Sequence, residues 1–273
     1  MEQPTFCVRG QALQALEQTD PATKVALVSQ LPGDGPFDTG RVFAAARPLP
    51  GRPDNPPLVP AQQVPARSVG TLQGRAALLH SIAHIEFNAI NLALDILWRF
   101  PCMPVAFYRD WLNVAKEEAL HFSLLVRHLA SLGYAYGDFP AHNGLWEMAE
   151  RTADDIVARL ALVPRTLEAR GLDASPVVRD KLLAAGDPEA AAIIDTLLHD
   201  EIGHVATGNY WYRFVCEQRG HDPVAYFPVL SERYRAPRLR GPFNIAARLA
   251  AGFTQEELNA LQAPPASGSP AHP

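Results

Sequence analysis

The sequence lacks long apolar runs, a leader pattern and paired cysteines. It contains no uninterrupted run of about 18 apolar residues, so it predicts no membrane-spanning helix. Its first residues, MEQPTFCVRGQALQ, show neither the basic start nor the apolar stretch of a signal peptide. The three cysteines are far apart, odd in number and without a zinc-binding spacing, which fits free thiols in a reducing compartment. We therefore expect a cytoplasmic protein without disulfide bonds or a membrane partner.

Positive charge is also scarce. The formal net charge of -5 gives no general electrostatic reason to expect a nucleic-acid partner, although an RNA substrate stays open. The stretch SERYRAPRLRGP is a local exception with four arginines. These side chains belong either to a solvated loop or to a site that binds an anion, such as a phosphate-bearing small-molecule substrate. They are Arg233, Arg235, Arg238 and Arg240.

The N-terminal part of the chain is separated from the rest by a proline-rich segment. Residues 9–30 predict one short helix or two, broken near Asp20 and Pro21. Residues 46–67 contain seven prolines, which are incompatible with a regular helix or an internal strand. We interpret residues 1–70 as an N-terminal helical region followed by an extended strap, and place a domain boundary there.

From residue 71 onwards, apolar residues recur at helical spacing and strand signals are nearly absent. Long helices with short to moderate connections favour an all-α fold, an antiparallel four-helix bundle. Proline and glycine mark the helix ends, and Pro164 should kink or break the third helix. The four helices are predicted over about 71–100, 105–132, 143–170 and 187–219, with Gly171 ending the third.

The bundle over 71–220 is followed by a C-terminal extension over 221–262. Two short helices are expected in it, over about 243–252 and 254–262. The last segment, 263–273, has the composition of a disordered tail.

Two segments of the chain repeat one acidic motif. EEALH at 117–121 and DEIGH at 200–204 each contain a glutamate three residues before a histidine. Residues three apart lie on one face of a helix, so each carboxylate and imidazole can bind a single metal ion. One such pair arises often by chance, but two on the second and fourth predicted helices favour a shared site.

Each motif is preceded by a glutamate at a matched distance. Glu86 lies 32 residues before Glu118, and Glu168 lies 33 residues before Glu201. The apolar surroundings of these acids indicate burial, which is costly for a carboxylate unless it is paired or bound to metal. The candidate metal ligands are Glu86, Glu118, His121, Glu168, Glu201 and His204.

Glu168 has rivals on its own predicted helix. Glu147 and Glu150 lie 54 and 51 residues before Glu201, which breaks the match with the first half of the chain. We therefore choose Glu168, although Pro164 disturbs the helix close to it.

Two further acids directly precede the ligand glutamates. Glu117 and Asp200 lie within reach of the histidine on their own helix, or of the partner pair across the bundle. Metal-bound histidines usually donate their second N–H to a carboxylate or a carbonyl. We expect this role for both acids; the alternative is a solvated side chain.

Four segments in order and spacing carry a family resemblance: HSIAHIEFNAINLALD, KEEALHF, PRTLEARGLDASP and HDEIGHVATGNYWY. They resemble the ferritin-like superfamily and, more closely, an uncharacterised bacterial ferritin-like family of unknown function. The resemblance implies a four-helix bundle with a dinuclear centre of two iron ions, manganese ions or one of each, held by the six residues above. EARGLD is also similar to the EARS segment of tRNA-modifying di-iron hydroxylases, which implies a monooxygenase relative.

The leading hypothesis is an O₂-activating oxidoreductase that hydroxylates or oxidises an organic substrate. The substrate, the electron donor and the oligomeric state stay open, with a dimer as one option. The alternative from another class is iron storage, metal handling or peroxide detoxification. A third is a structural or partner-binding bundle without metal.

Overall fold

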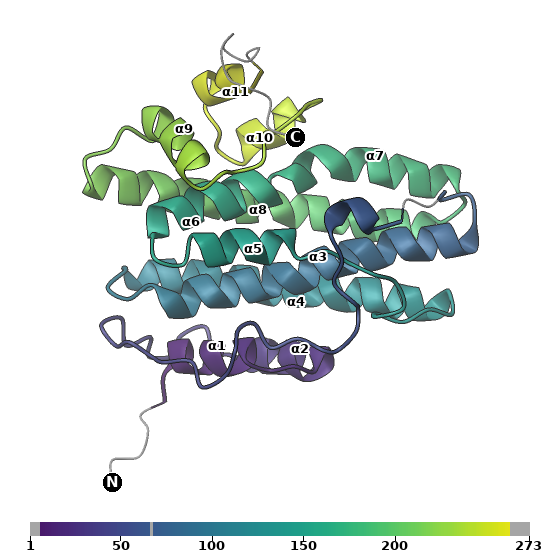
Figure 1. The fold of residues 1–273 in the computed structure, drawn as a ribbon, viewed down its shortest axis with the longest axis horizontal. Helices are drawn as coiled ribbons and strands as arrows, with labels where there is room; N and C mark the ends of the chain where they lie inside the picture. Colours follow the sequence, from purple (N-terminus) through teal and green to yellow (C-terminus); the bar gives the residue numbers. More distant parts are fainter. Residues whose placement is uncertain (1–5, 66–67, 263–273) are drawn as a thin grey trace.

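The fold is all-α, as expected. The computed structural model describes residues 6–65 and 68–262, and over these ranges regular structure is helical apart from one isolated bridge between Leu58 and Ala141. The helices lie in layers, with the N-terminal pair on one side and the C-terminal helices on the other (Figure 1). Among the described helices, none is both long and apolar enough to cross a membrane.

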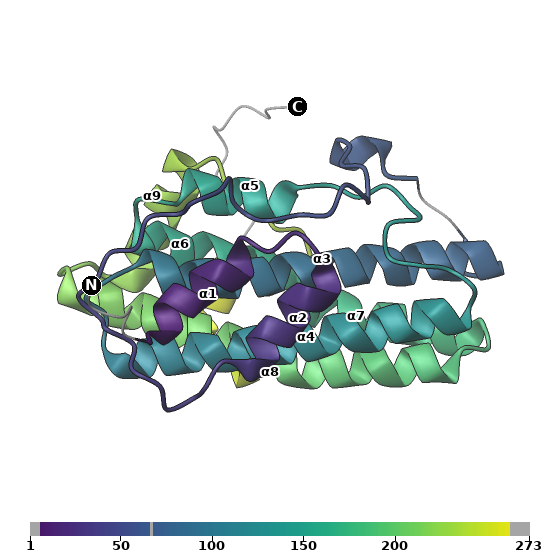
Figure 2. The same ribbon diagram turned by 90° about the horizontal axis from the view of Figure 1, so that it is seen from below.

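Two short helices form the N-terminal layer: α1 (Val8–Leu16) and α2 (Pro21–Gln30). The predicted break is confirmed, because the Asp20 carboxylate caps α2 by accepting from the Thr23 amide. Figure 2 shows this pair lying across the long helices behind it, and its apolar residues belong to the same buried core. The division of the chain into domains stays a prediction.

The proline-rich strap has almost no regular structure, as predicted. Over residues 46–65 the backbone is irregular apart from the isolated bridge at Leu58 and one 3₁₀ turn, η1 (Ala61–Gln63). The last residues of the predicted strap, 66–67, lie outside the described ranges.

Three long helices begin and end within two residues of their predicted bounds. Side-chain caps set two of the starts: Thr71 accepts from the Gly74 amide, and Asp187 accepts from the Ala190 amide. The helices are α3 (Leu72–Arg99), α4 (Val105–Ser131) and α8 (Pro188–Gln218). α3 packs along α4, and α4 contacts α8.

The prediction of a single helix over 143–170 is wrong in two respects. The segment divides into α5 (Gly144–Arg151), α6 (Ile156–Leu162) and a π-helical segment, η2 (Val163–Glu168). Helix α7 (Arg170–Ala184) then continues through Gly171, which therefore does not end a helix.

The π-helical segment explains how the chain passes the predicted break. Pro164 has no N–H to donate, and its carbonyl accepts from the amide of Ala169, five residues later, at 3.1 Å. α7 lies close to α8 at Gly171, where a Cβ would be 3.6 Å from Cγ of Glu201 and could be accommodated. α7 packs along α8 beyond this point.

The C-terminal layer contains one helix that was not predicted, α9 (Pro223–Arg233). The two predicted short helices are confirmed as α10 (Ile245–Ala250) and α11 (Gln255–Gln262). A capping box starts α11, because the Thr254 amide donates to Glu257 and the Glu257 amide donates to the Thr254 hydroxyl. The predicted disordered tail over 263–273 lies outside the described residues.

Candidate metal centre

The repeated motifs meet between α4 and α8. Glu118 and His121 lie on one face of α4, and His204 reaches them from α8. All three side chains are buried, with exposed fractions of 2% or less. Glu86 joins them from α3 and is 8% exposed.

Glu118 lies between the two imidazoles. Its Oε2 is 3.4 Å from Nδ1 of His121, and its Oε1 is 2.9 Å from Nδ1 of His204. Glu86 Oε2 is 3.3 Å from the first of these nitrogens, and Glu201 Oε2 is 3.1 Å from the second. Two groups of three ligands, each with its atoms within 4.8 Å of one another, therefore share Glu118.

Glu168, at the end of η2, lines the same cavity as Glu86, Glu118 and Glu201. Its Oε2 atom is buried without a hydrogen-bond partner. The two alternative candidates for this ligand, Glu147 and Glu150, do not line this cavity. Both lie on α5, where Glu147 is exposed, and where Glu150 accepts a hydrogen bond from Nε1 of Trp146 at 2.9 Å.

The two acids that precede the ligand glutamates contact the histidines of the opposite helix. Asp200 on α8 lies 3.0 Å from Nε2 of His121 on α4. Glu117 on α4 lies 2.7 Å from Nε2 of His204 on α8. These crossed pairs leave both Nδ1 atoms facing the central carboxylates. The geometry therefore favours the contact across the helices over the one within each helix.

Burial, together with the charges of neighbouring groups, shifts the pKa values of the acids. Burial, reinforced by nearby carboxylates, raises the pKa of Glu86 and of Glu168 well above the usual range. Burial also raises the pKa of Glu201, despite its hydrogen bond with His204. Glu118 differs, because the two neighbouring histidines outweigh its burial and lower its pKa.

The pKa values of both histidines are raised. Burial alone would lower the pKa of His121, but the carboxylates of Glu118 and Glu86 close to its Nδ1 raise it to about 11. The pKa of His204 is also raised, because Glu118 and Glu117 outweigh its burial. In a cluster without metal, protons thus compensate the negative charge that a pair of cations would otherwise neutralise.

Unsatisfied atoms of the cluster fit a bound cation. Oε2 of Glu118, Nδ1 of His121 and Oε2 of Glu168 are buried without a hydrogen bond, and they come from three segments of the chain. Buried polar atoms are rarely left in this state. Carboxylate oxygens together with imidazole nitrogens are ligands that suit Fe(II) and Mn(II). The residues present therefore fit a metal pair.

The four glutamates of the cluster line a cavity of about 280 Å³ with mainly apolar walls. Sequence reasoning missed the contributions of His142, Leu145, Ser175 and Val178 to it. Ser175 and Val178 lie on the part of α7 that was predicted to be a loop, so no signal placed them there. The apolar wall residues are Ile82, Ile85, Ala89, Leu145, Leu167, Ala174, Val178, Ile194 and Leu197.

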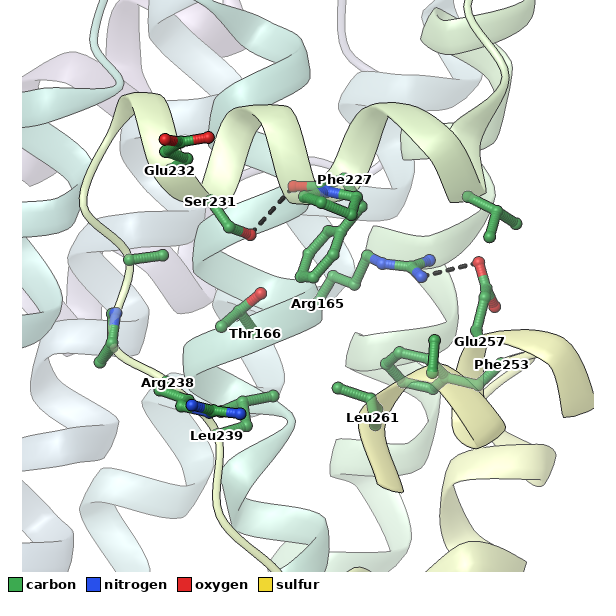
Figure 3. Close-up of a pocket in the computed structure, with 15 residues that line it drawn as sticks. Arg165, Thr166, Phe227, Ser231, Glu232, Arg238, Leu239, Phe253, Glu257 and Leu261 are labelled. Atoms are coloured by element: carbon green, nitrogen blue, oxygen red, sulfur yellow. Dashed lines mark hydrogen bonds and ion pairs between the residues drawn. The ribbon is translucent and has the colours of Figure 1, made fainter. Parts of the chain in front are cut away.

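The four arginines proposed as an anion contact lie elsewhere. All are exposed at the end of α9 or in the following loop, and none lines the cavity of the acidic cluster. One of them, Arg238, lines a separate cavity beside α9 (Figure 3).

Comparison with known proteins identifies the family. The family model described as protein of unknown function, DUF455, matches residues 17–259. A relative from Haemophilus influenzae, named "Uncharacterized protein", is 53% identical over 214 residues, which cover 76% of this chain and 74% of the relative. No solved structure matches the chain significantly. The chain therefore belongs to the DUF455 family of proteins of unknown function.

Proposed function

We propose that this protein is a ferritin-like four-helix bundle with a dinuclear iron or manganese centre, and that it is an O₂-activating oxidoreductase. The observation that carries the proposal is the position of Glu118 between two inward-facing Nδ1 atoms, each with a further carboxylate beside it. Two half-sites that share one carboxylate are the arrangement expected of carboxylate-bridged metal pairs in such bundles.

In this proposal each side chain has a defined task. Glu86, Glu118 and His121 would hold metal in one half-site, and Glu118, Glu201 and His204 in the other. Glu168 lines the cavity next to them and would supply the sixth ligand. Asp200 and Glu117 would keep both imidazoles in the orientation described above.

When bound to these residues, iron or manganese would supply the redox chemistry for the reduction of O₂. The chain itself holds the ligands and provides a mainly apolar cavity that limits access of water to the cluster. Hydroxylation of a substrate also requires two electrons from an external reductant, whose identity stays open. The apolar walls support an organic substrate over a role in metal storage.

Elemental analysis tests the metal site. Protein made in medium supplemented with iron and manganese should contain about two ions per chain. Glu118→Gln should lose most of this metal, because an amide nitrogen replaces one of the two central oxygens. Glu147→Gln is the matched control on the exposed face of α5 and should retain the metal. Wild-type protein without metal, or full occupancy in Glu118→Gln, would overturn the proposed centre.

Oxygen consumption tests the activity separately. Chemically reduced, metal-loaded protein should consume O₂, whereas Glu118→Gln should not. Protein that binds two ions but mineralises added iron into a large particle would instead support the alternative of iron storage.

A further inference from the structure

The cavity of the acidic cluster extends from the glutamates along α7 and α8. These two helices are antiparallel (Figure 1), and Gly171 faces Glu201, because a Cβ added at Gly171 would lie 3.6 Å from Cγ of Glu201. Val178 lies seven residues after Gly171, and Ile194 lies seven residues before Glu201. Seven residues make about two helical turns and roughly 10 Å of helix. Both side chains therefore line the cavity at a similar distance from the cluster.

Helix α3 provides a third wall in the same direction. Helix α4 is antiparallel to both α3 and α8, so α3 and α8 run the same way. Ile82 lies one turn before Glu86 and therefore on the same side of the cluster as Ile194. The three helices thus border an elongated space that leads from the carboxylates to Ile82, Val178 and Ile194.

Hydrocarbon makes up most of the wall beyond the glutamates. Transfer of an apolar chain from water into such a space is favourable, whereas a charged group would lose its hydration there. Besides the four glutamates, the polar lining residues are His142, Arg170 and Ser175, and Arg170 is exposed to solvent. The wall therefore favours the hydrocarbon part of a ligand.

The cavity opens to solvent between α3 and α7. Ile85 of α3 is 41% exposed, and Arg170 and Ala174 of α7 are also exposed, yet all three line the cavity. The opening gives a ligand from solution a route to the glutamates.

The size of the cavity limits the ligand. Its volume of about 280 Å³ lies just below the range of roughly 300 to 1,000 Å³ that is usual for small-molecule sites. A water molecule takes up about 30 Å³ of the liquid, so the cavity corresponds to about nine water molecules. A ligand of about nine non-hydrogen atoms would therefore fill it.

We propose that the substrate of the proposed metal centre has one hydrocarbon chain of about eight carbons, which lies beside the glutamates and ends near Val178 and Ile194. This inference rests on the proposed function, because it names the substrate class of that site. Hydroxylation would insert one oxygen atom of O₂ into a C–H bond of the chain and release the other as water. The two electrons come from the external reductant and the two protons from solvent. Val178 then limits the length of chain that fits.

Isothermal titration calorimetry of the full chain with hexan-1-ol, octan-1-ol and decan-1-ol tests the size of the ligand. Affinity should rise about fourfold with each methylene group from hexan-1-ol to octan-1-ol, as expected for burial of hydrocarbon. It should change less than about threefold from octan-1-ol to decan-1-ol, because the cavity is then full. No binding of octan-1-ol, or an equally steep rise up to decan-1-ol, would overturn the proposal.

Variants locate the chain. Val178→Trp fills the part of the cavity far from the glutamates and should weaken octan-1-ol binding at least about tenfold, because it displaces more than one methylene group. Val177→Trp is the matched control: Val177 is 51% exposed and does not line the cavity, so affinity should change less than about twofold. Equal affinities in the two variants would place the ligand elsewhere and refute the proposal.

Thermal unfolding checks that both variants fold. Ala174→Trp at the exposed opening provides a second test that does not disturb a buried position, and it should also weaken octan-1-ol binding. Unchanged affinity in Ala174→Trp would exclude the opening between α3 and α7 as the route of entry.

Nuclear magnetic resonance tests whether the chain lies beside the metal centre. Mn²⁺ is paramagnetic and broadens the signals of nearby protons, so the signals of octan-1-ol should broaden with Mn²⁺-loaded protein but not with Zn²⁺-loaded protein. Protein that contains Mn²⁺ and binds octan-1-ol without this broadening would refute the inference and leave the metal centre in place. Protein in which elemental analysis finds no Mn²⁺ would instead contradict the proposed function, and with it the assignment of a substrate.

Discussion

At the scale of single residues, the crossed acid–histidine pairs are the most informative feature. Asp200 orients a histidine of α4, and Glu117 orients a histidine of α8, so each helix positions a candidate ligand of the other. A change to either acid therefore acts on a candidate ligand without removing one.

Loss of one such acid should weaken metal binding. We expect Asp200→Ala to lower the affinity for Mn²⁺ by 10- to 100-fold, the usual effect of removing a carboxylate that orients a histidine ligand. Metal titration followed by calorimetry measures this change. Asp195→Ala, an exposed acid on the same helix, is the control and should bind like wild type. Unchanged affinity in Asp200→Ala would show that His121 needs no such partner.

Lys24 provides a prediction about pH. It is fully buried, where it donates to the carbonyl oxygens of Leu16 and Gly51 and to the Asn91 side chain. Burial, together with the charge of Arg52, lowers its pKa to about 7. Between this value and the unfolded pKa near 10.5, the unfolded chain binds more protons than the folded one. The contribution of Lys24 to the free energy of unfolding should therefore rise with pH over that range.

Chemical unfolding at several pH values tests this sign. The free energy of unfolding of wild type relative to Lys24→Met should rise from pH 7 to pH 9, by at most about 1.4 kcal/mol per pH unit. Lys181→Met removes an exposed lysine and should show no such trend. A flat difference for Lys24→Met would mean that its amine keeps an ordinary pKa.

The sequence predicts the candidate ligands better than their mutual contacts. Helical spacing alone places Glu118 with His121, and Glu201 with His204, because both members of a pair lie on one helix. The choice between contacts within and across helices depends on the register of α4 against α8. Local spacing does not specify that register, so the sequence leaves both contacts of Glu117 and Asp200 open.

At the scale of elements, the approach of η2 to α8 depends on one glycine. A Cβ added at Gly208 would lie 2.7 Å from Cβ of Pro164, a distance that forces one of the helices to shift. The proline ring is rigid, so it offers little relief.

Gly208→Ala should therefore destabilise the protein by about 1 to 3 kcal/mol, the usual cost of overpacking, despite the better helix propensity of alanine. Gly203→Ala in the same helix meets no atom within 4 Å and should stabilise by about 0.5 to 1 kcal/mol. Thermal and urea unfolding compare the pair. Equal stabilisation by both substitutions would contradict close packing at Pro164.

Local sequence signals predict three long helices but not α7 or α9. Gly171 and Pro176 are poor helix formers, yet both lie inside α7, because packing along α8 outweighs their propensity. The start of α9 does carry a signal that the prediction overlooked: Asp222 caps the helix and Pro223 occupies its first turn. The cavity beside α9 depends on tertiary packing and could not be derived from this pattern.

At the scale of the whole molecule, the candidate ligands join the main helical layers. They come from α3, α4, η2 and α8, so a bound metal pair would link segments far apart in the sequence. We expect removal of metal with a chelator to lower the melting temperature, and Mn²⁺ to restore it. Saturation at 100 times the dissociation constant is worth about 2.7 kcal/mol per site. Glu118→Gln is the control, and its melting temperature should be the same with and without Mn²⁺.

The π-helical segment also has a thermodynamic consequence. Arg165 lines the cavity beside α9, and Glu168 lines the cavity of the acidic cluster. Less than one helical turn of backbone separates the two residues. If a ligand in the first cavity changes the position of that turn, it changes the affinity for ions at the second. Linkage then requires the reciprocal effect, so ions would alter the affinity for that ligand by an equal factor.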